Sequence, residues 1–113
     1  MALKPLRWVG RSLDELLGFP ATVRREVGYA LYVAQSGGRH PSAKPLKGFG
    51  GAGVVEIVED HAGDTYRTVY TVRLSDAIYV LHAFQKKATR GIATPKREIE
   101  LIKERLAMIE RRR

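Results

Sequence analysis

Arginine and lysine side chains are spaced in the second half of the chain as a phosphate-binding surface would require. Arg67 and Arg73 fall on the same side of a predicted strand, because strand side chains alternate between two faces. Lys86 and Lys87 follow the next predicted strand directly. Guanidinium groups bind phosphate through paired hydrogen bonds, and ammonium groups bind it as compact charges. The pattern therefore indicates a sheet that delivers cations to one edge.

Histidine is the other residue type that could transfer protons near neutral pH. His82 lies inside an apolar run, Ile78–Phe84, that is typical of a strand covered on both faces. We therefore expect a core histidine with a local hydrogen bond rather than a general base. His40 and His61 fall in predicted loops and stay open as candidates. The three histidines lack metal-ligand spacing, so no metal site is expected.

Two helices are predicted in the first third of the chain, after a short strand at Leu6–Val9. Ser12 and Glu15 form a capping-box pattern, with Ser12 as the N-cap of a short helix that Gly18 ends. Pro20 then takes the first position of a longer helix, whose apolar residues recur at helical spacing. The apolar stripe of this helix needs a sheet face to cover it.

Residues 39–53 are predicted to be a loop. Gly48, Gly50 and Gly51 superficially suggest a phosphate-cradling loop, but the Gly-Lys-Ser/Thr ending and the strand-to-helix context are missing. We interpret these glycines as a flexible bend or bulge.

Three strands and a helix complete the prediction. The strands are expected at Val54–Glu59, Tyr66–Leu74 and Ile78–Phe84. In the middle strand, the face that carries the tyrosines is expected to pack on the helices, and the face that carries the two arginines to point away. Thr94 is the predicted N-cap of the last helix, and Pro95 its first residue. The order β-α-α-β-β-β-α predicts a small α+β domain with a mainly antiparallel sheet.

The composition limits the class of protein. Twenty lysine and arginine residues against 12 aspartate and glutamate residues give a net charge of +8 in 113 residues, which indicates a polyanionic partner such as nucleic acid. The length suits one domain. The absence of cysteine excludes disulfides, thiol catalysis and cysteine zinc sites. With no membrane-spanning run and no signal-peptide pattern, we expect a cytoplasmic protein with no membrane partner.

The ordered set of motifs resembles the RelE/ParE superfamily of bacterial toxins, and within it the HigB-like, phage-derived branch. The segments that carry the resemblance are Tyr66–Tyr70, Tyr79–Lys87, Gly91–Pro95 with Glu98 and Ile99, and Leu46–Gly48. The similarity covers nearly the whole chain and implies a single toxin domain at 1–113. It implies a type II toxin neutralised by an antitoxin, of the helix-turn-helix kind, encoded next to it. RelE and HigB toxins cut mRNA on the ribosome, whereas ParE toxins poison DNA gyrase, and fold alone does not choose between them.

The resemblance also implies roles for the cations. RNA can be cut without metal when its own 2′-hydroxyl attacks the adjacent phosphate, and the protein then neutralises charge and moves protons. Arg67 matches the family's strand arginine and is expected to clamp the phosphate; its alternative role is an ion pair with Glu56 or Glu59. Lys86 and Lys87 match the basic catalytic segment and are expected to stabilise the phosphorane or protonate the leaving oxygen. Their alternative role is phosphate binding without chemistry.

Further cations are expected to hold RNA or the ribosome, and no cofactor is implied. These residues are Lys44, Lys47, Arg73, Arg90, Lys96 and Arg97. One departure from the family is the lack of any tyrosine after Tyr79 and of any histidine after His82. Either the lysines take over proton transfer, or the activity is weak or different. The alternatives to an mRNA endonuclease are a gyrase poison and a non-toxic nucleic-acid-binding domain. A strongly salt-dependent affinity for RNA or DNA without growth arrest would favour the binding domain.

Overall fold

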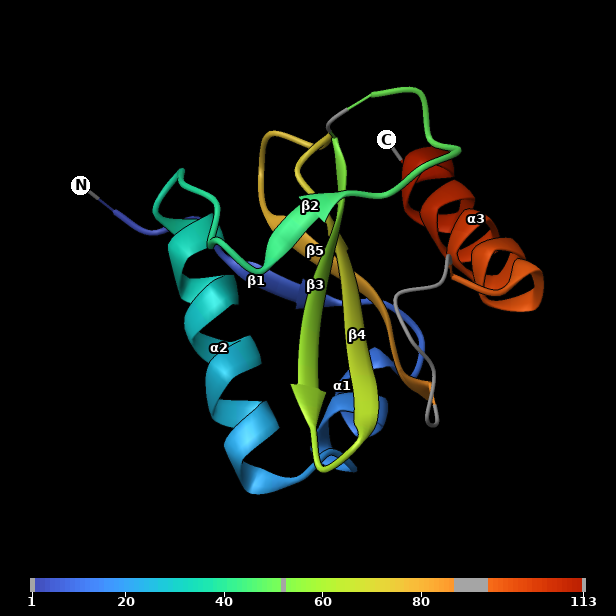
Figure 1. The fold of residues 1–113 in the computed structure, drawn as a ribbon. Helices are drawn as coiled ribbons and strands as arrows, with labels where there is room; N and C mark the ends of the chain where they lie inside the picture. Colours follow the sequence, from blue (N-terminus) through green and yellow to red (C-terminus); the bar gives the residue numbers. More distant parts are fainter. Residues whose placement is uncertain (1, 52, 87–93, 113) are drawn as a thin grey trace.

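The computed structural model describes residues 2–51, 53–86 and 94–112. Within them, five strands form one sheet, with helices on both of its faces (Figure 1). In chain order the elements are β1 (Leu6–Trp8), α1 (Ser12–Leu17), α2 (Ala21–Gln35), β2 (Ala43–Pro45), β3 (Val54–His61), β4 (Asp64–Thr71), β5 (Ile78–Lys86) and α3 (Lys96–Arg111). None of the described helices is both long and apolar enough to cross a membrane.

The strands follow the order β1-β5-β4-β3-β2 across the sheet. β1 runs parallel to β5, and the other neighbours are antiparallel. The predicted α+β class with a mainly antiparallel sheet is therefore confirmed. β2 lies in the segment predicted to be a loop. It is a three-residue edge strand that includes Pro45, and such a strand is too short for a periodic signal and tolerates proline because it is at the edge.

The predicted helix starts are each wrong by one residue. Ser12 is already the first residue of α1, while Pro20 and Pro95 precede α2 and α3 with ψ of 150°. No side chain caps any of the three N-termini by a hydrogen bond. The reason lies in tertiary contacts, since the expected capping groups of Glu15 and Thr94 bond to side chains of other elements.

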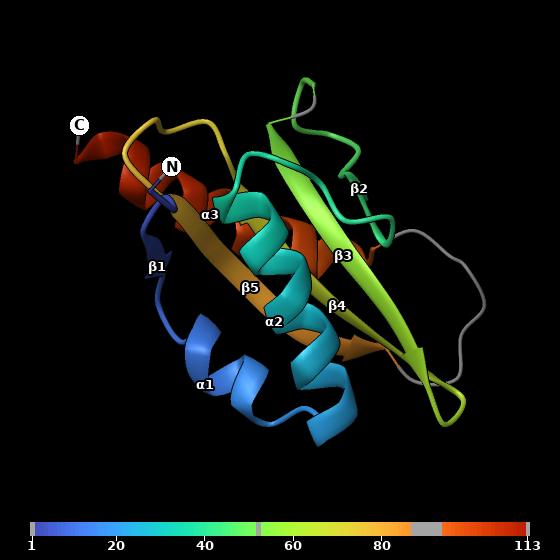
Figure 2. The same cartoon turned by 90° about the vertical axis from the view of Figure 1, so that its left-hand side faces the viewer.

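Apolar side chains are buried on both faces of the sheet. On one face α1 and α2 cover a core that includes Val27, Ile57 and Tyr70. On the other face α3 covers a second core that includes Val69 and Ile102 (Figure 2). The expectation that this second face points away from packing is wrong, because the apolar stripe of α3 needs cover as much as that of α2 does.

A bulge in β5 turns two successive side chains toward α3. Pairing with β4 passes from Val69 opposite His82 to Tyr70 opposite Val80, so that Leu81 is an extra residue on β5. Leu81 joins the core under α3, and His82 contacts a glutamate of α3. The bulge therefore brings a titratable side chain into the α3 interface.

Candidate functional site

Arg67 and Glu56 form a buried ion pair between β4 and β3. Their exposed fractions are 3% and 2%, and Nη1 of Arg67 donates to Oε2 of Glu56 at 3.1 Å. The same Nη1 donates to the hydroxyl of Thr94 at 3.2 Å, and this hydroxyl donates to the same Glu56 oxygen. The three side chains therefore connect the sheet to the segment that leads into α3.

The structure corrects the expected exposure of Arg67. Its guanidinium does not lie on an open sheet face, and the ion pair with Glu56 that was left open as an alternative is formed. The strand register explains the pair. Glu56 lies opposite Val69, and Arg67 lies opposite Val58. The two charged residues are therefore diagonal neighbours on one face of the sheet. A role of Arg67 as phosphate clamp stays a prediction.

Lys86 is the last residue of β5 and lies on the same sheet face as Arg67. In the β4–β5 register Arg67 lies opposite Phe84, and Thr65 lies opposite Lys86. Because side chains alternate along a strand, these four residues share a face. The structure thus brings two predicted catalytic cations to one face of the sheet. Lys87 and Arg90 lie outside the described residues.

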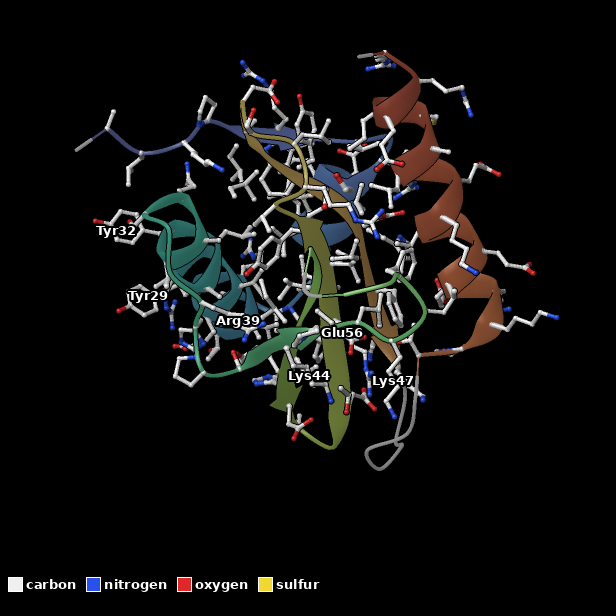
Figure 3. All side chains as sticks on the ribbon, turned by 90° about the horizontal axis from the view of Figure 1, so that it is seen from above. Tyr29, Tyr32, Arg39, Lys44, Lys47 and Glu56 are labelled. Atoms are coloured by element: carbon white, nitrogen blue, oxygen red, sulfur yellow. The ribbon has the colours of Figure 1, made fainter. Side chains whose placement is uncertain are left out.

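Four further predicted cations are exposed near the buried pair, on β2, after β2 and in the first turn of α3. They are Lys44, Lys47, Lys96 and Arg97. Lys44 is the register partner of Glu56, and Figure 3 shows it beside Glu56 and Lys47. Nε of Arg97 is 3.7 Å from Oε2 of Glu98, and the Arg97 side chain is 90% exposed. Together with Lys86 and the Arg67–Glu56 pair, these residues are the candidate site.

Arg73 lies apart from the candidate site. β4 ends at Thr71, so the expected strand register with Arg67 does not reach Arg73. Its guanidinium contacts a Glu110 oxygen at 3.5 Å and donates to the carbonyl oxygen of Phe49. Arg73 therefore joins the loop after β2 to the far end of α3.

A second buried polar cluster joins α1, β5 and α3. His82 is 4% exposed, with Nδ1 3.0 Å from Oε1 of Glu15 and Nε2 2.6 Å from Oε1 of Glu98. Arg105 donates to the same Glu15 oxygen at 3.0 Å and to the carbonyl oxygen of Leu81 at 2.8 Å. The expected burial of His82 is confirmed, but its partners are distant in sequence rather than local.

Sequence reasoning missed the partners of His82. The sequence did contain a signal for Arg105 as a buried partner. Arg105 follows Ile102 by three residues and precedes Ile109 by four, so its charge lies inside the apolar stripe of α3. Burial alone raises the pKa of Glu15, but the Arg105 hydrogen bond, the charge of His82 and the Ala83 N–H together lower that pKa below its ordinary 4.5. Glu15 is therefore an ionised anchor of the cluster.

The fold is shared with solved structures of RelE toxins. The chain matches the model of the phage-derived Gp49-like proteins (DUF891) over residues 14–107. It belongs to this family. No curated protein matches the chain. The resemblance to the RelE superfamily that was predicted from the sequence is thus confirmed for the fold, and the HigB-like branch stays a prediction.

Two solved structures with the same fold are those of an Escherichia coli toxin. The free Escherichia coli toxin RelE with two arginines changed to alanine is 21% identical, has a TM-score of 0.62 and is matched over 96% of this chain and 99% of that chain. The isolated E. coli RelE toxin is 24% identical, with a TM-score of 0.57 and coverage of 89% and 97%. The RelBE2 toxin–antitoxin complex of Mycobacterium tuberculosis is more distant, at 21% identity, a TM-score of 0.49 and coverage of 79% and 97%.

Proposed function

We propose that the protein is the toxin of a type II toxin–antitoxin system and acts as a ribosome-dependent mRNA endonuclease of the HigB-like kind. The observation that carries the proposal is the set of exposed cations around the Arg67–Glu56 pair on one face of a RelE fold. Fold likeness supports the class, and the cations support a surface for an RNA backbone.

The chemistry would use the 2′-hydroxyl of the RNA as the nucleophile. Its attack on the adjacent phosphate adds negative charge to the phosphorane, which nearby ammonium groups stabilise. We assign charge stabilisation to Lys47 and Lys86, and proton delivery to the leaving oxygen to Lys86 or Lys87. A phosphate that replaced Glu56 and Thr94 as the acceptor from Nη1 of Arg67 would bring this guanidinium into the site.

The first turn of α3 supports an anionic ligand at this face. A helix N-terminus carries partial positive charge, so cations placed there are unfavourable in the absence of a bound anion. Lys96 and Arg97 nevertheless occupy this turn, where the acidic residue Glu98 is bonded to His82. An RNA phosphate beside them would satisfy both the side chains and the free backbone N–H groups.

We also propose the partners. A net charge of +8 favours an acidic antitoxin, which we expect to be a helix-turn-helix protein encoded beside this chain, and the ribosome and mRNA supply the other polyanions. The expected location is the cytoplasm, where ribosomes and mRNA are found. No small-molecule cofactor is needed for attack by the 2′-hydroxyl.

Lys86→Met is expected to lower the rate of mRNA cleavage about a hundredfold, since it removes a charge that stabilises the phosphorane. The matched control is Arg25→Gln, which removes a charge from the exposed surface of α2 on the other face of the sheet. Both variants are expressed by induction, growth is followed, and mRNA 5′ ends are mapped.

We expect the wild type and Arg25→Gln to arrest growth and to produce codon-phased cuts in mRNA. We expect Lys86→Met to lose both effects. Arrest without new mRNA ends would contradict the nuclease and indicate gyrase. A chain that causes no arrest but binds RNA or DNA in a strongly salt-dependent way would be a nucleic-acid-binding domain.

A further inference from the structure

A cavity of about 380 Å³ lies beside the C-terminal end of α2, on the face of the sheet opposite α3. Its apolar wall includes Ala34, Val55 and Ile78, which belong to the core under α2. Pockets of this size hold small organic ligands. The cavity is separate from the candidate site, which occupies the other face.

Tyr70 gives this cavity a polar group that is not bonded to any other described residue. The residue is 1% exposed and lines the cavity, yet its hydroxyl makes no hydrogen bond to another described residue. The hydroxyl of a buried tyrosine normally has a hydrogen-bond partner. Burial raises the pKa of Tyr70, an effect that the charge of Arg39 partly offsets. The hydroxyl is therefore protonated at neutral pH and can donate to a ligand.

The charged residues that line the cavity are both cations, Lys4 and Arg39. Two hydrogen bonds between Lys4 and Gln35 hold the chain near the cavity, one from the backbone N–H of Lys4 and one from the Gln35 amide. Figure 3 shows Arg39 just beyond the end of α2. The carbonyl end of α2 also attracts cations, but that attraction leaves the Tyr70 hydroxyl unexplained.

We propose that this cavity binds a small organic anion, in which a carboxylate or phosphate group is attached to a compact apolar body. The oxyanion accepts a hydrogen bond from the Tyr70 hydroxyl and lies between the charges of Lys4 and Arg39. The apolar body covers the wall at Ala34 and Ile78. The anion comes either from a free small molecule or from an acidic residue of a bound partner.

Phenylacetate is the first probe, because it combines a carboxylate with an apolar ring. Added to the ¹⁵N-labelled protein, it is expected to shift the amide signals of Gly37, Gly38 and Arg39 in a saturable way. Phenyl phosphate is expected to do the same, and the neutral phenylacetamide to bind at least about tenfold more weakly. Absence of saturable shifts, or equal affinity for the acid and the amide, would overturn the proposal.

Tyr70→Phe removes only the hydroxyl and is expected to weaken phenylacetate binding by about tenfold or more, the effect of losing a hydrogen bond to a charged group. Tyr66→Phe is the matched control, since Tyr66 is 7% exposed on the same face but does not line the cavity. It should bind the probe as the wild type does. Unchanged affinity in folded Tyr70→Phe would show that the hydroxyl does not contact the ligand and would overturn the site.

A second titration separates the two sources of the anion, and this arm alone depends on the proposed function. It uses the protein purified together with its antitoxin. Loss of probe binding in the complex assigns the cavity to an acidic residue of the partner, whereas retained binding assigns it to a free small molecule. Both results support the site. Because the probe experiment measures binding to the isolated chain, a failed nuclease assay does not affect it.

Discussion

Replacing Arg67 with alanine is expected to lower the free energy of unfolding by about 3–5 kcal/mol, because Glu56 then keeps a buried charge without its partner. Denaturant unfolding of the purified variant measures this loss. A variant as stable as the wild type would show that the pair is not buried in solution. Loss of activity in Arg67→Ala therefore cannot by itself assign a catalytic role.

A stability-matched variant separates the two roles of Arg67. The triple variant Glu56→Leu/Arg67→Met/Thr94→Val removes three side chains that bond to one another, so neither charge of the buried pair is left without the other. It is expected to have a free energy of unfolding within about 1–2 kcal/mol of the wild type. If this stable variant no longer cleaves mRNA, the polar side chains of Glu56, Arg67 and Thr94 in the wild type are needed for the chemistry. If it cleaves normally, Arg67 only holds the sheet to the segment before α3.

The second large effect is expected at the cluster around His82. Arg105→Met should lower the free energy of unfolding by about 3 kcal/mol, because the Glu15 carboxylate and the Leu81 carbonyl each lose the donor that Arg105 supplies. Denaturant unfolding at pH 7 measures it. The control is Arg111→Met, in the exposed last turn of the same helix, which should change stability by less than about 0.5 kcal/mol.

The contribution of Glu15 is expected to depend on pH in a defined direction. Its pKa is lower in the folded chain than the ordinary 4.5, so the stability it contributes is present above that value and is lost as the pH falls through the folded-state pKa. The stability difference between the wild type and Glu15→Gln should therefore be largest near neutral pH and shrink below about pH 4. Asp14→Asn, at an exposed neighbour with a 3.7 Å contact to Arg11, should show little of this trend. A difference that grows as the pH falls would contradict the lowered pKa of Glu15.

Periodicity predicted the long elements of this fold because each buries one face. The helical spacing of Val23, Val27 and Ala30 predicted α2, and the apolar run at Ile78 predicted β5. Periodicity could not predict β2, which is three residues long and forms by pairing with β3. Nor could it set helix starts, since the groups that cap isolated helices are used here for tertiary contacts.

The burial of charge was the least predictable feature of the candidate site. Alternation correctly placed Arg67 and Val69 on the face opposite Tyr66 and Tyr70, but it gave no information on whether another element covers that face. Val69 is covered by α3, and Arg67 is bonded to Thr94 just before α3, both far along the chain. For Arg73, the expected register extended past the end of β4, where alternation no longer applies.

The parallel pairing of β1 with β5 has a consequence for the order in which the chain folds during translation. Leu6 pairs with Ile78, so the first strand to leave the ribosome has no neighbour until the last strand has been made. The loop between them must close before the sheet is complete, and such long-range pairing is slow. The sheet face that carries the candidate site therefore forms only near the end of synthesis. A nascent chain of this kind would give the proposed antitoxin time to meet it before the fold is finished.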